Sequence, residues 1–279
     1  MYKILLKQDL VPNIHLLKIQ APAIASKAQP GQFVVIRTDE HGERIPMTIA
    51  DWDEEEGSIT IVFLEVGTTT RKLASLKTGD FITNFVGPLG LPTHIEKLGT
   101  VACAGGCYGI AGIMPIARAM RQAGNKVISL IEARSQYLLF WEDRLRSVSD
   151  QLIITTVDGS YGDKGWNPQK IEELVAGGNR PDLVVAVGCT YMMKTCADTT
   201  KPFGIKTIVH LNPIMVDGTG MCGCCRVSVG GITKFACVDG PDFDGHQVDW
   251  DLLLARRGQY LTEEVQSLQA WDCQNWVKI

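Results

Sequence analysis

The sequence has no excess of positive charge and few histidines. Its 279 residues contain 27 Lys and Arg against 31 Asp and Glu, which gives a net charge of −4. A nucleic-acid-binding protein would normally carry a basic excess, so we expect no nucleic-acid partner. The five histidines show no metal-binding or catalytic spacing, and neither a catalytic triad nor a pair of catalytic carboxylates is recognisable. The chemistry of this chain is therefore expected to reside in other residue types.

The sequence also lacks the pattern of a signal peptide and of a membrane span. No apolar core of roughly 7–15 residues follows the first charged residues. The longest uncharged run lies between Lys97 and Arg118, but several glycines and Pro115 interrupt it in a strand–loop–helix pattern. The nine cysteines are an odd number and cannot all pair within one chain. They are expected to be thiols or metal ligands in a reducing compartment, so we expect a cytoplasmic protein.

Residues 1–98 are predicted to form a small antiparallel β-barrel. Short segments rich in branched and aromatic residues alternate there with turn signals such as Pro30-Gly31. Several short strands at this spacing are typical of a barrel. The expected strands cover residues 2–6, 14–19, 33–38, 58–64 and 80–86, and a helix is expected over residues 70–76.

Residues 99–211 show a different sequence pattern, in which predicted apolar strands alternate with predicted helices. This alternation predicts βαβ units and a parallel sheet covered on both faces. The remaining residues, 212–279, contain five of the nine cysteines among Gly-rich turns. At about 150 residues per domain, the length allows two domains and a small third. The predicted fold is therefore an antiparallel barrel, a parallel α/β domain and a small C-terminal domain.

The strongest chemical signal is a group of cysteines in the C-terminal segment. Asp217, Cys222, Cys225 and Cys237 form the pattern D-x4-C-x2-C-x11-C, which begins in a loop rich in glycine. The plant-type 2Fe–2S spacing is C-x4-C-x2-C with a distant fourth Cys, so Asp217 stands at the first ligand position. A carboxylate oxygen can bind ferric iron, and the pattern therefore predicts a 2Fe–2S cluster with an altered charge balance. The alternative is a zinc site that adds Cys224 to the three other cysteines.

Two segments of the barrel region carry groups suited to a flavin dinucleotide. Arg44-Ile45-Pro46-Met47-Thr48-Ile49 is expected at the end of a barrel strand. There, the Arg can hold a pyrophosphate and the Thr hydroxyl can reach a flavin ring atom. In Glu65-Val66-Gly67-Thr68-Thr69-Thr70, Gly67 opens a predicted helix whose threonines and backbone N–H groups suit a phosphate. A solvated Arg and an ordinary threonine N-cap are the simpler interpretations.

A third segment has the context of a dinucleotide phosphate loop. Ala104-Gly105-Gly106-Cys107-Tyr108-Gly109 follows a predicted strand and precedes a predicted helix, although it is not a strict GxGxxG. Glu132 ends the next strand and can hold a ribose hydroxyl, which favours NAD over NADP. Nearby Arg134 favours a phosphate instead. Loops that begin at Asp158 and Gly188 also follow strands, where ligands bind in such sheets.

The order of these motifs resembles a known family. R-I-P-M-T is followed by V-G-T-T-T, G-P-L-G, A-G-G-C-Y-G-I-A-G, V-D-G-S-Y-G, G-C-T-Y-M-M-K and the cysteine group. This order resembles the ferredoxin–NADP reductase superfamily, in the branch of the dihydroorotate dehydrogenase electron-transfer subunits. Within that branch, V-D-G-T-G-M-C-G-x-C-R-V is more similar to the small-subunit family of NADH-dependent reduced ferredoxin:NADP oxidoreductases, in which an aspartate replaces the first cluster cysteine.

The resemblance implies an FAD-binding barrel at residues 1–98, an NAD(H)-binding domain at 99–211 and a 2Fe–2S segment with a tail at 212–279. The chain departs from the family pattern at Val187 and Cys189, where the family usually has Cys before the intervening Gly and Pro after it. The R-I-P-M-T motif is also a loosened form of R-P-x-[ST]. The implied contacts are Arg44, Met47, Thr48, Ile49, Glu65, Gly67, Thr68, Thr69 and Thr70 for FAD; Gly105, Gly106, Gly109, Glu132, Arg134 and Asp158 for NAD(H); and Asp217, Cys222, Cys225 and Cys237 for the cluster.

The function implied by the resemblance is electron transfer. A nicotinamide exchanges hydride with the flavin, and the flavin passes single electrons to the cluster. A larger partner subunit with its own flavin and 4Fe–4S clusters is implied in a heterodimer or larger complex, where electrons are bifurcated between ferredoxin and NADP(H). Trp271 and Trp276 are candidates for that interface. The alternatives are a dihydroorotate dehydrogenase electron-transfer subunit and a zinc-stabilised binding module without turnover.

Overall fold

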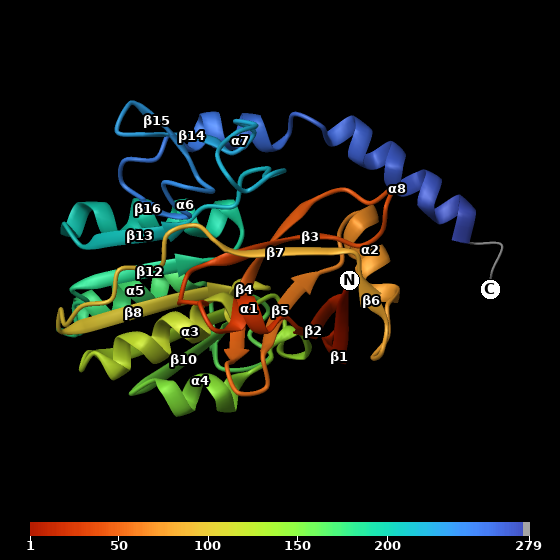
Figure 1. Ribbon diagram of the computed structural model, residues 1–279. Coiled ribbons are helices and arrows are strands. Elements are labelled where there is room, and N and C mark those ends of the chain that lie inside the picture. The colour runs from red at the N-terminus through yellow and green to blue at the C-terminus, as the bar shows by residue number, and fades with distance from the viewer. Residues whose placement is uncertain (276–279) are drawn as a thin grey trace.

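Two large sheets organise the molecule. The structure, a computed structural model, describes residues 1–275 and contains two seven-stranded sheets and a two-stranded hairpin (Figure 1). The first sheet uses only strands from the N-terminal part of the chain, and the second begins at Thr100. The predicted combination of an antiparallel barrel with a parallel α/β sheet is therefore confirmed. Trp276, a predicted interface residue, lies outside the described residues.

The first sheet is the predicted barrel. Its strand order is β6-β1-β2-β5-β4-β3-β7, and every pairing in it is antiparallel. Apolar side chains such as Leu17, Ile36 and Phe85 fill its interior and are buried. The elements are β1 (Tyr2–Val11), β2 (Ile14–Gln20), α1 (Pro22–Ala25), β3 (Phe33–Arg37), β4 (Ile45–Asp53), β5 (Ser58–Leu64), α2 (Thr68–Ser75), β6 (Phe81–Ile82) and β7 (Asn84–Leu89).

Strand β4 was not predicted, and it corrects the position of the R-I-P-M-T motif. The motif lies at the start of β4, not at the end of a strand. Proline cannot donate to a β ladder and is confined to positions where one side of a strand is unpaired. Pro46 lies opposite Val35 of β3, whereas the pairing of β4 with β5 begins only at Ile49. The missing N–H therefore removes no ladder hydrogen bond on the β5 side.

The second sheet is parallel except at one edge. Its strand order is β11-β10-β9-β8-β12-β13-β16, and only β16 runs antiparallel to its neighbour. Helices α3 and α4 pack on one face with the barrel, and α5 and α6 pack on the other. The elements are β8 (Thr100–Gly106), α3 (Gly109–Gln122), β9 (Lys126–Ala133), η1 (Gln136–Leu138), α4 (Glu142–Val148), β10 (Gln151–Thr156), β11 (Asp163–Lys164), α5 (Asn167–Ala176), β12 (Leu183–Val187), α6 (Thr190–Thr200), η2 (Lys201–Phe203) and β13 (Lys206–His210).

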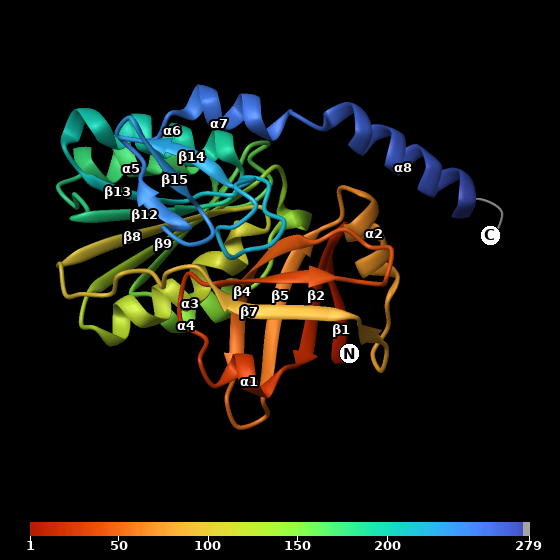
Figure 2. The same cartoon turned by 45° about the horizontal axis from the view of Figure 1, so that its top comes forward.

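The C-terminal segment is attached to the α/β sheet. Strand β16 (Asp242–Asp244) pairs with β13, and the hairpin of β14 (Arg226–Val229) and β15 (Ile232–Phe235) lies nearby (Figure 2). Helix α7 (Trp250–Arg257) buries Trp250 and Leu253 against the same core. Helix α8 (Leu261–Asn275) extends away from the body beside α2 in both views (Figures 1 and 2). None of the helices within residues 1–275 has the length and apolarity needed to span a bilayer.

The barrel and the α/β domain share a packed interface. Ile14, Leu16 and Val62 of the barrel belong to the same apolar cluster as Ile113 and Met114 of α3. Asp51 of β4 accepts a hydrogen bond of 2.9 Å from Arg118 of α3 and a second one from Arg144 of α4. The two units are therefore held in a fixed relation by both apolar burial and ion pairs.

Candidate functional site

The glycines of the phosphate loop are required by close backbone approach. Gly105 ends β8 together with Gly106, and Gly109 begins α3. A Cβ at Gly109 would lie 2.0 Å from the carbonyl oxygen of Val187, and a Cβ at Gly105 would lie 3.0 Å from the carbonyl oxygen of Gly109. These contacts bring the first turn of α3 against the carboxyl ends of β8 and β12. The N-terminus of a helix suits a phosphate, but the N–H groups of Ile110 and Ala111 already donate to the carbonyl oxygens of Cys107 at 3.2 Å and Tyr108 at 3.1 Å.

Glu132 has a structural contact that the sequence did not predict. Its side chain is buried, and one carboxylate oxygen accepts a 2.6 Å hydrogen bond from the backbone N–H of Asn167 at the start of α5. Asn167 in turn donates its side-chain N–H to the carbonyl oxygen of Gly105 at 3.2 Å. Burial raises the pKa of the Glu132 carboxyl above its ordinary value. One oxygen of Glu132 thus fixes α5 beneath the phosphate loop, and the ribose contact of Glu132 stays a prediction.

Arg134 and Asp158 lie together at the exposed edge of the sheet. Arg134 follows β9 and Asp158 follows β10, and the Asp158 backbone N–H donates to the Arg134 carbonyl oxygen at 3.2 Å. Hydrogen bonds from the Ser135 and Ser160 hydroxyls, together with the Ser160 backbone N–H, hold the pKa of Asp158 at about 2. This edge therefore offers one fixed negative charge and one exposed guanidinium to a nucleotide.

The R-I-P-M-T motif lies where the barrel meets the α/β domain. Arg44 is exposed, and Met47 and Thr48 are half-buried. The Thr48 hydroxyl lies 3.5 Å from Nε2 of His210, whose Nδ1 lies 2.9 Å from a carboxylate oxygen of Asp242. The contact of His210 with Thr48 was missed by sequence reasoning, because 162 positions separate the two residues.

Ile49 has a buried side chain in the barrel core. Its backbone N–H is also paired, because it donates to the carbonyl oxygen of Gln32 at 3.0 Å. A flavin contact of Ile49 stays a prediction.

The start of α2 carries the other predicted flavin residues. The hydroxyl of Thr70 accepts hydrogen bonds of 2.9 Å from the N–H groups of Val66 and of Gly67, the N-cap residue, as the N3 side chain does in a capping box. The Thr69 hydroxyl donates to Glu43 at 3.2 Å, and the Thr68 hydroxyl lies 2.8 Å from that of Ser267 in α8. All three hydroxyls thus have protein partners. The groups left for a phosphate are the N–H groups of the first helical turn.

Glu65 belongs to a chain of charged side chains beside this helix. Its carboxylate lies 3.1 Å from Nε2 of His15 and 3.8 Å from Nε of Arg71. Arg71 also pairs with Asp272 of α8. The contacts of Glu65 in the structure are therefore with protein groups.

The four predicted cluster ligands lie in two pairs. The buried Sγ atoms of Cys225 and Cys237 are 3.2 Å apart. The carboxylate of Asp217 accepts hydrogen bonds from the backbone N–H groups of Thr219 at 2.9 Å and of Cys222 at 2.8 Å, which lower its pKa. Burial and the neighbouring Cys225 thiol raise the pKa of Cys237 to about 12, so a metal must displace that proton.

Two pairs of ligands fit a two-iron cluster, in which each iron takes two protein ligands. Glycines of positive φ shape the loop from Asp217 to Cys225: Gly218 (φ +76°), Gly220 (φ +85°) and Gly223 (φ +66°). Within residues 1–275, no three His, Cys, Asp or Glu side chains converge as they would around one metal ion. All nine cysteines are free thiols.

Comparison with known proteins identifies the family. Residues 212–249 match the family described as the iron–sulfur cluster binding domain of dihydroorotate dehydrogenase B. A Thermotoga maritima homologue of the dihydroorotate dehydrogenase B (NAD(+)) electron transfer subunit is 49% identical over 246 residues, which are 88% of this chain and 86% of that protein. The chain belongs to the family of dihydroorotate dehydrogenase B electron-transfer subunits and their homologues.

Solved structures extend this likeness to nearly the whole fold. A chain of an NADH-dependent reduced ferredoxin-NADP oxidoreductase, solved in a study of flavin-based electron bifurcation, superposes with a TM-score of 0.92. It is 46% identical, and the match covers 97% of this chain and 98% of that one. A Neisseria gonorrhoeae ferredoxin NADP+ reductase shares the fold at a TM-score of 0.61 and 18% identity, over 73% of this chain and 90% of that one.

The family assignment confirms the predicted class. As a member of this family, the chain is an electron-transfer subunit of an oxidoreductase. The match over residues 212–249 supports the iron–sulfur interpretation of the cysteine group over the zinc-stabilised module. The individual ligand and cofactor contacts remain predictions.

Proposed function

We propose that this chain is the small subunit of an NADH-dependent reduced ferredoxin:NADP oxidoreductase. In this role it passes electrons between NAD(H), FAD and a 2Fe–2S cluster to a larger flavin and 4Fe–4S subunit, which bifurcates them between ferredoxin and NADP(H). The observation that carries the proposal is the superposition at a TM-score of 0.92 over 97% of the chain. Asp217 at the first ligand position supports it, because the small-subunit family that the cysteine group resembles has an aspartate at this position.

The chain's own residues fall into three groups in this proposal. Arg44 and the first turn of α2 would hold the FAD pyrophosphate, and Met47 and Thr48 would face the flavin ring at the domain interface. Gly105, Gly106 and Gly109 would admit the NAD(H) pyrophosphate, and Arg134 and Asp158 would hold its adenosine end. Asp217, Cys222, Cys225 and Cys237 would hold the cluster. Bound flavin supplies the conversion from two-electron to one-electron transfer, and the bound cluster supplies one-electron transfer.

We further propose the domain limits 1–98 for the FAD-binding barrel, 99–211 for the NAD(H)-binding domain and 212–279 for the cluster segment with its tail. The change of sheet between Leu89 and Thr100 supports the first limit, and the end of β13 at His210 supports the second. Nine free thiols support a reducing cytoplasm as the working compartment.

The second candidate is the electron-transfer subunit of a dihydroorotate dehydrogenase. The match of residues 212–249 and the identity of 49% to the Thermotoga maritima homologue favour it. The two candidates differ in the larger subunit that must be present. Isolation of the native complex and identification of that subunit distinguish them.

An anaerobic ultraviolet–visible spectrum of the purified chain, with iron analysis and an NADH titration, tests the proposal. We expect flavin absorption and two irons per chain, and we expect NADH to bleach both chromophores. The matched variants C225A and C224A distinguish a predicted cluster ligand from the adjacent cysteine. C225A should lose the iron, and C224A should keep it. Bound zinc without flavin absorption, after reconstitution with FAD and iron has failed, would reject the proposal.

A further inference from the structure

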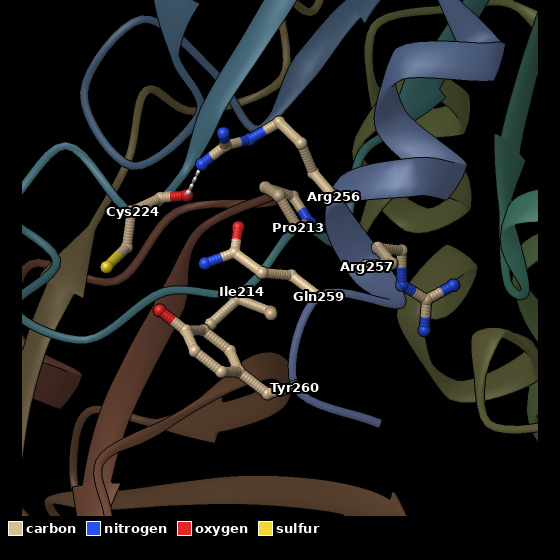
Figure 3. A pocket seen from close by; sticks show the side chains of 7 residues that line it. All are labelled: Pro213, Ile214, Cys224, Arg256, Arg257, Gln259 and Tyr260. Atoms are coloured by element: carbon tan, nitrogen blue, oxygen red, sulfur yellow. Dashed lines mark hydrogen bonds between the residues drawn. The ribbon is translucent and has the colours of Figure 1, made fainter. Parts of the chain in front are cut away.

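Two consecutive arginines at the end of α7 reach toward different parts of the molecule. Arg256 and Arg257 form the last turn of this helix and line a small pocket together with Pro213, Ile214, Cys224, Gln259 and Tyr260. Figure 3 shows that the two guanidinium groups point in different directions, one toward Cys224 and the other away from it. One helical turn therefore contacts two separate loops.

Arg256 contacts the cluster loop. Its guanidinium donates a 3.1 Å hydrogen bond to the carbonyl oxygen of Cys224 (Figure 3), which lies between the predicted ligands Cys222 and Cys225. A positive charge and a hydrogen bond beside an iron–sulfur cluster both favour its reduced form, which carries one more negative charge. Arg256 is thus placed to set the position of this loop and the reduction potential of a cluster bound there.

Arg257 contacts the nucleotide loops through a chain of side chains. Its guanidinium donates to the hydroxyl of Thr190, and that hydroxyl donates to Oδ1 of Asn212 at 3.1 Å. The Asn212 side-chain N–H donates to the Tyr108 hydroxyl at 2.7 Å and to the Gly188 carbonyl oxygen at 3.2 Å. The Tyr108 hydroxyl donates to the same carbonyl oxygen at 3.2 Å. Tyr108 lies in the phosphate loop between Gly106 and Gly109.

This chain of contacts joins four segments of the sequence. Asn212 is 104 positions from Tyr108, and Arg257 is 67 positions from Thr190. Thr190 is buried, so its hydroxyl cannot form a hydrogen bond to bulk water in place of these partners. Burial raises the pKa of the Tyr108 hydroxyl, so it stays protonated and donates at neutral pH. The Gly188 carbonyl, which accepts from both side chains, fixes the end of β12 to the phosphate loop.

We propose that Arg256 and Arg257 are positioning residues that couple nucleotide binding to the reduction potential of the cluster. The proposal rests on the proposed function, because it requires both a nucleotide and a cluster. A nucleotide phosphate that engages the loop of Tyr108 changes the contacts of Asn212 and Thr190. Arg257 then shifts, and α7 carries the shift to Arg256 and the cluster loop. By linkage, the redox state of the cluster must change nucleotide affinity by the same factor.

The test uses ADP-ribose, which contains the phosphates and adenosine of NAD but cannot accept hydride. The midpoint potential of the cluster in the FAD-loaded chain is measured by redox titration followed by electron paramagnetic resonance, with and without ADP-ribose. We expect ADP-ribose to bind the oxidised cluster form about fivefold more tightly than the reduced form, at the lower end of common allosteric couplings. For a one-electron couple, this factor lowers the midpoint potential by about 40 mV.

Four variants locate the coupling. R257Q should keep the ligand-free midpoint potential and lose most of the shift, and R257K should restore part of it. R256Q should lower the ligand-free potential and also lose most of the shift. R146Q changes the same charge on α4 and should behave as wild type. Direct repulsion between the phosphates and the cluster persists in every variant and weakens with salt, so the titrations are repeated at high salt.

The outcomes separate the inference from the proposed function. An equal shift in wild type and R257Q, or no shift in wild type although ADP-ribose binds, would overturn the coupling and leave the proposed function intact. A chain that retains iron but does not bind ADP-ribose would overturn the nucleotide site and the coupling with it. A chain without iron after reconstitution would overturn both.

Discussion

At the scale of single residues, the contacts of Glu132 in the structure favour a structural role over the predicted ribose contact. Its carboxylate caps α5 through the N–H of Asn167 and is buried. We therefore expect E132Q, which keeps an acceptor oxygen, to leave the KM for NADH nearly unchanged. A lost ribose hydrogen bond would cost about 1 kcal/mol and raise that KM roughly fivefold. Steady-state kinetics with NADH measure this directly, and R134Q at the exposed sheet edge is the comparison expected to raise the KM.

The same residue has a predictable effect on stability. Because burial raises the pKa of Glu132 above the value of 4.5 in an unfolded chain, the folded state binds the proton more tightly. The contribution of Glu132 to stability is thus complete below about pH 4.5 and declines as the pH rises through the folded pKa. E132Q should match or exceed wild-type thermal stability at neutral pH and lose any advantage in acid. The free energy of unfolding of E132A should be about 1–3 kcal/mol lower than that of wild type, since the buried N–H of Asn167 is left without an acceptor. A Tm of E132Q well below wild type at pH 7 would contradict this account.

Contacts that follow from local spacing can be predicted from the sequence, and contacts that depend on the orientation of a side chain cannot. The group Asp217, Cys222, Cys225 and Cys237 follows a ligand spacing, and the structure pairs Cys225 with Cys237 at 3.2 Å. Glu132 sits at a strand end as expected, but its partner is 35 positions away in the chain. The pattern of apolar residues in a sequence does not determine the direction in which such a side chain points.

At the scale of elements, α8 supports the helix that is proposed to bind the flavin phosphates. Ser267 contacts Thr68, Asp272 pairs with Arg71, and the Lys72 ammonium lies 5.9 Å from the centre of the Trp271 ring. An exposed pair alone contributes about 0–1 kcal/mol, so D272N should change overall stability little. Removal of residues 259–279 should instead speed amide hydrogen exchange in α2, residues Thr68–Ser75, and weaken FAD retention during gel filtration.

Hydrogen exchange read by mass spectrometry provides its own control in this experiment. Helix α4 (Glu142–Val148) lies on the α/β domain, and its exchange should be the same in the full and shortened chains. Equal protection of α2 in both chains would show that α8 does not stabilise it. Faster exchange everywhere would indicate a general loss of stability instead.

Elements with a strong apolar period were predicted well, and elements with mixed character were missed. The strands at 14–19 and 58–64 and the helix that follows the phosphate loop were expected within a few residues of their observed limits. Strand β4 was not predicted because Pro46 near its start and Asp51 and Asp53 near its end interrupt the apolar pattern. Strand β16 has three residues and forms only because the edge of β13 is available to it, which is a property of the assembled sheet.

At the scale of the whole molecule, Asp51 adds ion pairs to the apolar packing that holds the barrel against the α/β domain. Its carboxylate accepts from Arg118 at 2.9 Å and from Arg144, and the Arg118 guanidinium also lies 5.2 Å from the centre of the Trp52 ring. The flavin and nicotinamide sites proposed above lie on opposite sides of this interface. Hydride transfer requires their reacting atoms to lie about 3–3.5 Å apart, so a small change of orientation slows it.

Replacement of Asp51 by Asn therefore has two expected consequences. The unfolding free energy should fall by about 1.5–3 kcal/mol, because hydrogen bonds to a charged group are lost and two arginines are left without their anion. Stopped-flow reduction of the flavin by NADH should slow at saturating NADH, with the midpoint potential of the cluster unchanged, since α7 and the cluster loop contact other parts of the sheet. D53N, at an exposed position on the same strand, is the matched control and should resemble wild type in all three measurements. A D51N chain with normal flavin reduction but reduced stability would mean that apolar packing of Ile14, Leu16 and Val62 on α3 is sufficient to orient the two domains.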